Sequence, residues 1–203
     1  MATTTTELDT ELSAVNSILG AIGQSPITTL DYTNPEIGFI YNILSEVNKD
    51  VQNEGWHFNK EYHIKQSPDA TTKHITIPST YLRIDATDGH DKNLDVVRRE
   101  GKLYNLVEHT YEFDDDIDID VTHLFAFEKI PPIFQRYIIY RSAVRAATQL
   151  VSNPQLVQLL QVQEAQSRAA CMEYECDQGD HSYFGWPHES SYRSYQPYNA
   201  LRR

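Results

Sequence analysis

The sequence has little cysteine and no long apolar run. Only Cys171 and Cys176 are cysteines among 203 residues. Because a chain of this size can bury a stable core without disulfide bonds, we expect both thiols to be reduced. The first residues are rich in Thr and acidic groups, unlike a signal peptide. No apolar stretch approaches roughly 18 residues, so we expect neither a secretion signal nor a membrane-spanning helix.

Basic residues are also scarce. The chain has 17 Lys+Arg against 29 Asp+Glu, a formal net charge of −12. Proteins dedicated to reading nucleic acids normally present a basic face to the phosphates. The charge balance therefore argues against that class of function.

Local catalytic motifs are missing as well. The sequence has no G-x-S-x-G nucleophile elbow, no phosphate-binding P-loop and no G-x-G-x-x-G fingerprint. Its eight histidines are scattered and form no metal-binding helical pair. We therefore expect no enzyme activity and no bound cofactor.

An acidic run at 112–120 is the one stretch that resembles a metal site. Asp114, Asp116 and Asp118 have the alternate spacing that can present carboxylates to Ca²⁺ or Mg²⁺. However, Ile117 and Ile119 alternate with the acids, which predicts a strand with an apolar inner face and an acidic outer face. A metal-dependent enzyme using this run stays as the less favoured alternative.

Helical periodicity appears at both ends of the chain. Apolar residues recur every three or four positions over 8–22, 37–51, 133–150 and 156–174. Asn34-Pro35 and Asn153-Pro154 each combine a capping residue with a proline suited to the first helical turn. These patterns predict two helical hairpins, one at each end of the chain.

The middle of the chain shows alternation typical of strands. We expect short strands over His57–Ile64, His74–Ile77, Tyr81–Ala86, Leu94–Arg99, Lys102–Val107 and Ile117–Phe127. Arg99-Glu100-Gly101 predicts a hairpin turn between two of them. The fold class is therefore α+β, a four-helix bundle formed by the two hairpins, with an inserted antiparallel β-rich domain and an extended C-terminal tail. The expected boundaries are 1–56 and 129–178 for the helices, 57–128 for the insertion and 179–203 for the tail.

Three arginines follow the predicted third helix: Arg136, Arg141 and Arg145. Two interpretations remain open. The arginines form ion pairs on the helix surface, or they cross to a neighbouring subunit, since Arg is favoured in interfaces. In the second interpretation a strip of a second copy, such as Asp114, Asp116 and Asp118, is the complementary surface.

The C-terminal tail is aromatic but has almost no aliphatic residues. No Ile, Leu or Val occurs between Gln163 and Ala200. Tyr and Trp often anchor protein–protein contacts. We expect the tail to dock on another subunit or partner, with packing on its own helices as the alternative. The candidate docking residues are Tyr183, Phe184, Trp186, Tyr192, Arg193, Tyr195 and Tyr198.

Three phrases together resemble a known family. They are Glu-Leu-Ser-Ala-Val-Asn-Ser-Ile-Leu at 11–19, Gly-Trp-His-Phe-Asn at 55–59, and Ile-Pro-Pro-Ile-Phe-Gln-Arg-Tyr-Ile at 130–138 leading into Arg-Ser-Ala-Val-Arg-Ala-Ala at 141–147. In this order and spacing, across about 1–178, the chain resembles the tail tubular protein A family. Its members are the head-to-tail adaptors of short-tailed bacteriophages of the autographivirus type. The β block resembles the family more in position than in sequence.

The resemblance implies a structural, non-enzymatic protein of the virion, assembled in the host bacterial cytoplasm. It implies a homo-oligomeric ring of twelve copies that binds the portal protein, the nozzle protein (tail tubular protein B) and the tail fibre. Double-stranded DNA would pass through the ring without specific contacts, and no membrane is involved. The alternative is another neck protein, such as a head-completion or stopper protein, with a different docking partner.

Overall fold

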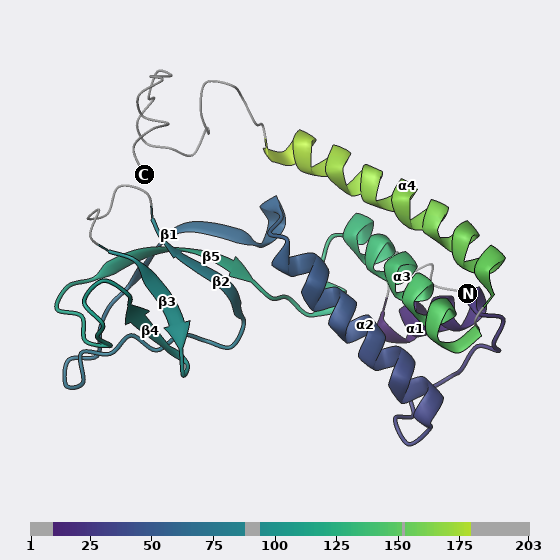
Figure 1. The fold of residues 1–203 in the computed structure, drawn as a ribbon, viewed down its shortest axis with the longest axis horizontal. Coiled ribbons are helices and arrows are strands. Elements are labelled where there is room, and N and C mark those ends of the chain that lie inside the picture. The colour runs from purple at the N-terminus through teal and green to yellow at the C-terminus, as the bar shows by residue number, and fades with distance from the viewer. Residues whose placement is uncertain (1–9, 88–93, 152, 180–203) are drawn as a thin grey trace, which may run out of the picture.

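The computed structural model describes residues 10–87, 94–151 and 153–179, with helices gathered at one end and strands at the other (Figure 1). This mixture of helices and antiparallel strands confirms the α+β class. The helices are α1 (Glu11–Ala21), α2 (Pro35–Asn53), α3 (Pro132–Ala146) and α4 (Pro154–Gly179). The strands are β1 (Lys60–Gln66), β2 (Tyr81–Ala86), β3 (Val96–Arg99), β4 (Lys102–Asn105) and β5 (Ile117–His123).

Side-chain caps begin three of the helices. Thr10 Oγ1 accepts a hydrogen bond from Ser13 N at 3.2 Å, which starts α1. Asn34 Oδ1 accepts one from Glu36 N at 3.1 Å, and Asn153 Oδ1 accepts one from Gln155 N at 3.1 Å. Each cap satisfies a backbone donor that the first turn leaves without an intrahelical partner. The predicted starts of α2 and α4 are therefore confirmed, whereas the predicted first residue of the α1 stripe, Leu8, lies outside the described residues.

Helix α3 lies at the centre of the helical packing. Its residues Phe134, Tyr137 and Ile138 are almost fully buried, and it packs against α1, α2 and α4. The helices and the segments beside them share one hydrophobic cluster, to which α1 contributes Val15 and Ile18 and α2 contributes Ile40 and Val47. Past Ala146 the chain continues as a π-helical turn, Ala147–Val151, before α4. The prediction of a helix reaching Leu150 is thus corrected in its last turn.

The strands form two antiparallel sheets. In the larger sheet the order is β1-β5-β2, so the last strand in sequence lies between the first two. Ile117, Ile119 and Val121 of β5 are buried in a second hydrophobic cluster made from the strand region. The smaller sheet is the β3–β4 hairpin, in which Arg99 pairs with Lys102. Its two turn residues, Glu100 and Gly101, have φ of 51° and 73°, which is the mirror-image turn that hairpins favour and confirms the predicted turn.

Several strand predictions need correction. Residues His74–Ile77 form only an isolated bridge, between Thr76 and Lys102, instead of a strand. β1 starts at Lys60 because His57–Asn59 form a 3₁₀ turn, and β4 ends at Asn105, whose Oδ1 accepts a hydrogen bond from Val107 N at 2.9 Å. β3 and β5 are shorter than expected and cover only Val96–Arg99 and Ile117–His123. In each case the alternation of apolar and polar residues extends beyond the residues whose backbones are paired.

A buried side-chain amide connects the helices to the sheet. Asn59 Nδ2 donates to Gln52 O at 2.8 Å and to His123 O at 2.9 Å, so it joins the end of α2 to the end of β5. Asn59 Oδ1 accepts from Trp56 N at 2.8 Å. Gly55 makes this approach possible, since its φ of 78° lies in the left-handed region that favours glycine. The Gly-Trp-x-Phe-Asn phrase is therefore one of the two connections between the helices and the strands, the other being the segment between β5 and α3.

Candidate functional site

The acids of the run at 112–120 lie in the segment before β5 and on that strand, and two of them pair with lysines. Lys65 Nζ lies 2.7 Å from Asp116 Oδ2, and Lys73 donates to Asp114 Oδ1. The Lys65 ammonium, helped by a Ser67 hydrogen bond, lowers the pKa of Asp116. Asp118 lies on β5 in register with Lys65. Within the residues that the structure describes, no group of three or more metal-ligating side chains comes together.

The predicted arginines lie beside carboxylates of α2. Arg145 lies 3.6 Å from Glu46 Oε2 and 3.4 Å from Asp50 Oδ2, and Arg141 Nη1 lies 3.0 Å from Glu54 Oε1. Arg136 is exposed near the start of α3. Two of the three predicted arginines therefore have ion-pair partners inside the chain, and Asp114, Asp116 and Asp118 lie in the sheet region, apart from these pairs.

Sequence reasoning missed the most connected group, which unites three helices. Glu54 at the end of α2 pairs with Arg141 of α3 and with Arg168 of α4, whose Nη2 lies 3.0 Å from Glu54 Oε2. The hydroxyl of Tyr137 accepts hydrogen bonds from Arg168 Nη1 at 2.8 Å and from Arg141 Nη1 at 3.2 Å. The available signal was that Arg168 and Glu164 are the only charged residues between Pro154 and Met172.

The surroundings of this group keep the Arg168 guanidinium charged and the nearby Cys171 thiol neutral. The hydrogen bonds that Arg168 donates to Glu54 and to Tyr137 raise its pKa above the usual value, so the guanidinium stays charged. Nearby, burial raises the pKa of the Cys171 thiol to about 12. Its Sγ lies 3.5 Å from Ile133 O, which accepts a hydrogen bond from the thiol. Cys171 therefore acts as a small apolar residue on the buried side of α4. Cys176 is exposed, and both cysteines are free thiols, as predicted.

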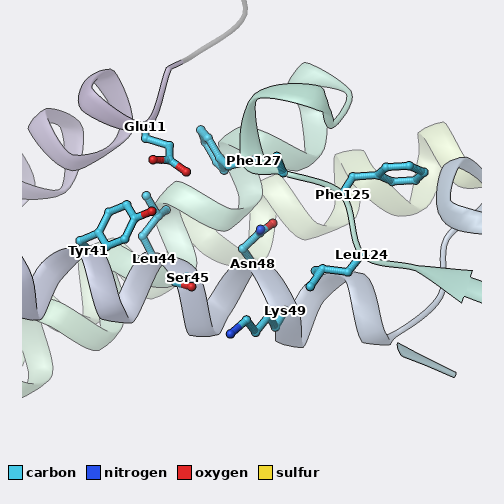
Figure 2. A pocket seen from close by; sticks show the side chains of 10 residues that line it. Glu11, Tyr41, Leu44, Ser45, Asn48, Lys49, Leu124, Phe125 and Phe127 are labelled. Carbon is cyan, nitrogen blue, oxygen red and sulfur yellow. The ribbon is translucent and has the colours of Figure 1, made fainter. Parts of the chain in front are cut away.

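A pocket of about 230 Å³ lies between α1, α2 and the segment that follows β5 (Figure 2). Leu44, Leu124 and Phe127 supply apolar walls, whereas Glu11 and Lys49 supply charge of both signs. Pockets that enclose small-molecule ligands usually measure about 300–1,000 Å³. The volume therefore suits one side chain of a partner better than a substrate.

Tyr41 reaches the pocket from α2, facing Glu11 (Figure 2). Burial, together with the Glu11 carboxylate and Tyr32, raises the pKa of Tyr41 to about 12. The hydroxyl thus stays protonated and bonds to its neighbours rather than acting as a base.

The remaining predicted residues lie outside the described part of the chain. Tyr183, Phe184, Trp186, Tyr192, Arg193, Tyr195 and Tyr198 all fall within 180–203. In the part of the chain that the structure does describe, no helix is both long enough and apolar enough to cross a membrane.

Comparison with known proteins points to one family. A family model described as tail tubular protein matches residues 12–181, which takes in every helix and strand described above except the first residue of α1, Glu11. A curated relative, tail tubular protein A of Klebsiella phage KP34, is 29% identical over 123 residues. That alignment covers 60% of this chain and 62% of the relative, so the chain spans less than two thirds of the relative's length.

Proposed function

The chain belongs to the tail tubular protein family, and from this membership we propose that it is the structural adaptor between the head and the tail of a short-tailed phage. Membership makes it a structural protein of the phage tail, with a place in the virion, and the family indicates a non-enzymatic role. The match over 12–181 carries the proposal because it includes both the helices and the β-rich insertion.

In the proposed assembly, copies of the chain form a ring, of twelve members, that binds the portal protein on one side and the nozzle protein and tail fibre on the other. The helical part acts as a four-helix bundle and the β-rich part as a domain inserted into it. The two separate hydrophobic clusters support a division into two parts, with Phe58, Phe125 and Phe127 of the proposed 57–128 insertion packed in the helical cluster. The buried amides of Gln52 and Asn59 support a rigid connection, which an adaptor under mechanical load needs.

The charge of the chain suits a channel through which DNA passes. At −12 per copy, twelve copies carry about −144 in total. An acidic channel wall repels the DNA phosphates. It also has few Lys and Arg side chains, whose binding to phosphates would release counterions from the DNA and hold it, so DNA can slide through. We propose non-specific passage of double-stranded DNA on this ground.

The residues that the sequence suggested for a subunit interface remain candidates, but those already paired within the chain are less favoured than the exposed one. Arg141 and Arg145 already pair within the chain, as do Asp114 and Asp116. Arg136 is exposed at the helix surface and is the member of the arginine set best placed to reach a neighbouring subunit. The aromatic residues of 179–203 are proposed to dock on the portal or on a neighbouring subunit.

The decisive experiment mixes the purified chain with the portal protein and images the product by electron microscopy. A ring of this chain seated on the portal ring is expected. A chain that never associates with the portal would contradict the adaptor role. Binding of the insertion to a different neck component, with no affinity for nozzle or fibre, would favour the stopper-protein alternative.

A further inference from the structure

One face of the β3–β4 hairpin carries a connected set of five side chains, in the strand part of the molecule (Figure 1). Arg99 and Lys102 are cross-strand partners, so their side chains lie on the same face. The Arg99 guanidinium lies over the ring of Tyr104, with Cζ 4.2 Å from the centroid. Tyr104 meets Tyr111 edge-on, with the centroids 4.8 Å apart. Tyr111 lies 6.2 Å from the His74 ring, whose Nδ1 is 3.0 Å from Lys102 Nζ. These five residues form the hairpin face; Arg99 is exposed and the other four are partly exposed.

Neutral groups hold the cations of this hairpin. Arg99 stacks on a phenol ring, and Lys102 donates to an imidazole, since an ammonium group can only donate. Arg98, the neighbour of Arg99 on β3, donates from Nη1 to Tyr81 O at 3.1 Å. The two strands and their turn contain these three cations and one carboxylate, Glu100. Within the described residues, none of the three cations forms an ion pair.

Elsewhere in the described residues, carboxylates lie against several cations. The cations paired in this way are Lys65, Lys73, Arg141, Arg145 and Arg168. The hairpin differs because its cations are positioned without a carboxylate that cancels their charge. It is therefore a local positive surface on a chain whose net charge is −12, and it suits an anionic partner.

The chemistry of the hairpin face matches phosphate. Arg, Lys and Tyr side chains are among the groups that contact phosphate oxygens in protein–DNA complexes. Such interfaces are polar and positively charged, whereas the centre of a protein–protein interface is apolar and depleted in lysine. The contacts with Tyr104 and His74 also hold the two cations before a ligand arrives, so less side-chain freedom is lost on binding.

We propose that the hairpin face binds phosphates of the double-stranded DNA that passes the protein, with Arg99 and Lys102 as the phosphate-binding groups. This inference rests on the DNA passage of the proposed function and names the residues that touch the DNA. Because the contacts go to the phosphates alone, they are independent of base sequence.

The acidity of the rest of the chain is compatible with this contact. Exposed charges are screened beyond about 8 Å at physiological ionic strength, so Arg99 and Lys102 act on phosphates at contact distance while remote carboxylates have little effect. Two phosphate contacts give a slope of about −1.8 for the logarithm of the binding constant against the logarithm of salt concentration. Between about 50 and 200 mM salt, binding then weakens by about tenfold. Contacts this weak guide DNA without holding it.

The first test compares two lysine variants of the full-length chain. Lys102→Gln removes a proposed phosphate contact, and Lys129→Gln is the matched control because Lys129 is exposed on a different element and removes the same charge. Binding to a fluorescent DNA duplex of mixed sequence is measured by anisotropy at several salt concentrations. At about 0.1 M salt, Lys102→Gln should bind about fivefold to tenfold more weakly, with the salt slope nearer to zero by about 1. Lys129→Gln should bind as the wild type does. A wild type that does not bind DNA, an unchanged Lys102→Gln, or equal losses in both variants would overturn the proposal.

The second test uses the wild-type chain and so does not depend on the folding of a variant. Brief treatment with acetic anhydride, followed by mass spectrometry, measures the reactivity of each lysine with and without the duplex. DNA should protect Lys102 several-fold and leave Lys129 unchanged. Poly-glutamate at the same concentration of charge is the probe for an acidic protein partner. Protection of Lys102 by poly-glutamate and not by DNA would assign the face to an acidic protein and overturn the proposal, as would protection by neither.

These outcomes are separate from those for the adaptor role. A chain that binds the portal but not DNA would support the adaptor role and contradict the phosphate contact. Conversely, a chain that binds DNA through Lys102 but never binds the portal would contradict the adaptor role and leave the phosphate contact standing.

Discussion

Gln52 and Phe125 form a reciprocal pair of hydrogen bonds across 73 residues of sequence. Gln52 Nε2 donates to Phe125 O at 2.9 Å, and Phe125 N donates to Gln52 Oε1 at 2.7 Å. The side-chain amide of Gln52 in α2 thus pairs with both the N–H and the C=O of Phe125, as a neighbouring strand would, in the segment that follows β5. This pairing ends the strand at His123 and directs the chain toward α3.

The Gln52 pair should contribute strongly to stability. Gln52→Leu leaves the N–H and C=O of Phe125 without these partners, and we expect a loss of about 2 kcal/mol in the free energy of unfolding. Chemical denaturation followed by tryptophan fluorescence measures it. Gln24→Leu is the matched control, because the Gln24 side chain donates to Glu36 at an exposed site, and it should change stability by less than about 0.5 kcal/mol. Equal effects of the two variants would contradict a special role for Gln52.

Glu54 should stabilise the packing of α4. Glu54→Gln removes the carboxylate shared by Arg141 and Arg168 and leaves two cations close together. Because these groups are partly exposed, we expect a loss of only about 1 kcal/mol. The difference from wild type should shrink at high salt, which screens the charges. Glu46→Gln, which breaks one longer contact to Arg145, should have a smaller effect in the same denaturation experiment.

Two glycines should respond to alanine in opposite directions. Gly55→Ala forces a side chain onto a residue with φ of 78° and brings the new Cβ to 2.6 Å from Lys60 Cε. We expect a loss of about 1–2 kcal/mol. Gly20→Ala, in α1, meets nothing within 4 Å, and should be neutral or stabilising by up to about 1 kcal/mol. Thermal unfolding of the two variants tests this, and destabilisation of both would show that the difference in backbone conformation does not decide the outcome.

The Cys171 thiol should make stability fall in alkaline solution. Its pKa is about 12 in the folded chain against 9.0 for an ordinary thiol. Above pH 9 the unfolded chain loses this proton while the folded chain keeps it, so stability decreases from about pH 9 toward pH 12. Cys171→Ala should weaken that dependence in denaturation curves taken at several pH values. In the native wild type a thiol reagent at pH 8 should modify one cysteine, Cys176, and in denaturant it should modify two.

The tail should matter more for docking than for folding. Deleting residues 179–203 removes Tyr183, Trp186, Tyr195 and three further Tyr or Phe side chains. We expect weaker binding to the portal or to neighbouring copies, with a much smaller change in melting temperature. Binding assays and thermal scans on the same preparations compare the two quantities. A parallel loss of both would mean that the tail packs on the helices of its own chain.

The sequence alone determined the local structure of this protein. The cap at Asn34, the Asn153-Pro154 start and the Glu100-Gly101 turn depend on residues a few positions apart, so their patterns are visible in the sequence. The alternation of Ile117 and Ile119 with aspartates gave the correct faces of β5 for the same reason. The ends of the strands were predicted poorly, because alternation persists where backbone partners are lacking.

Only the tertiary structure decided which distant residues meet. Nothing local in the sequence indicates that Gln52 bonds to Phe125, or that Glu54 forms ion pairs with arginines of both α3 and α4. Those contacts depend on the order β1-β5-β2 and on α3 packing at the centre of the helices. The same packing buries one side of α4 and leaves Leu159 and Val162 uncovered. That burial depends on the fold and not on the periodicity of the helix.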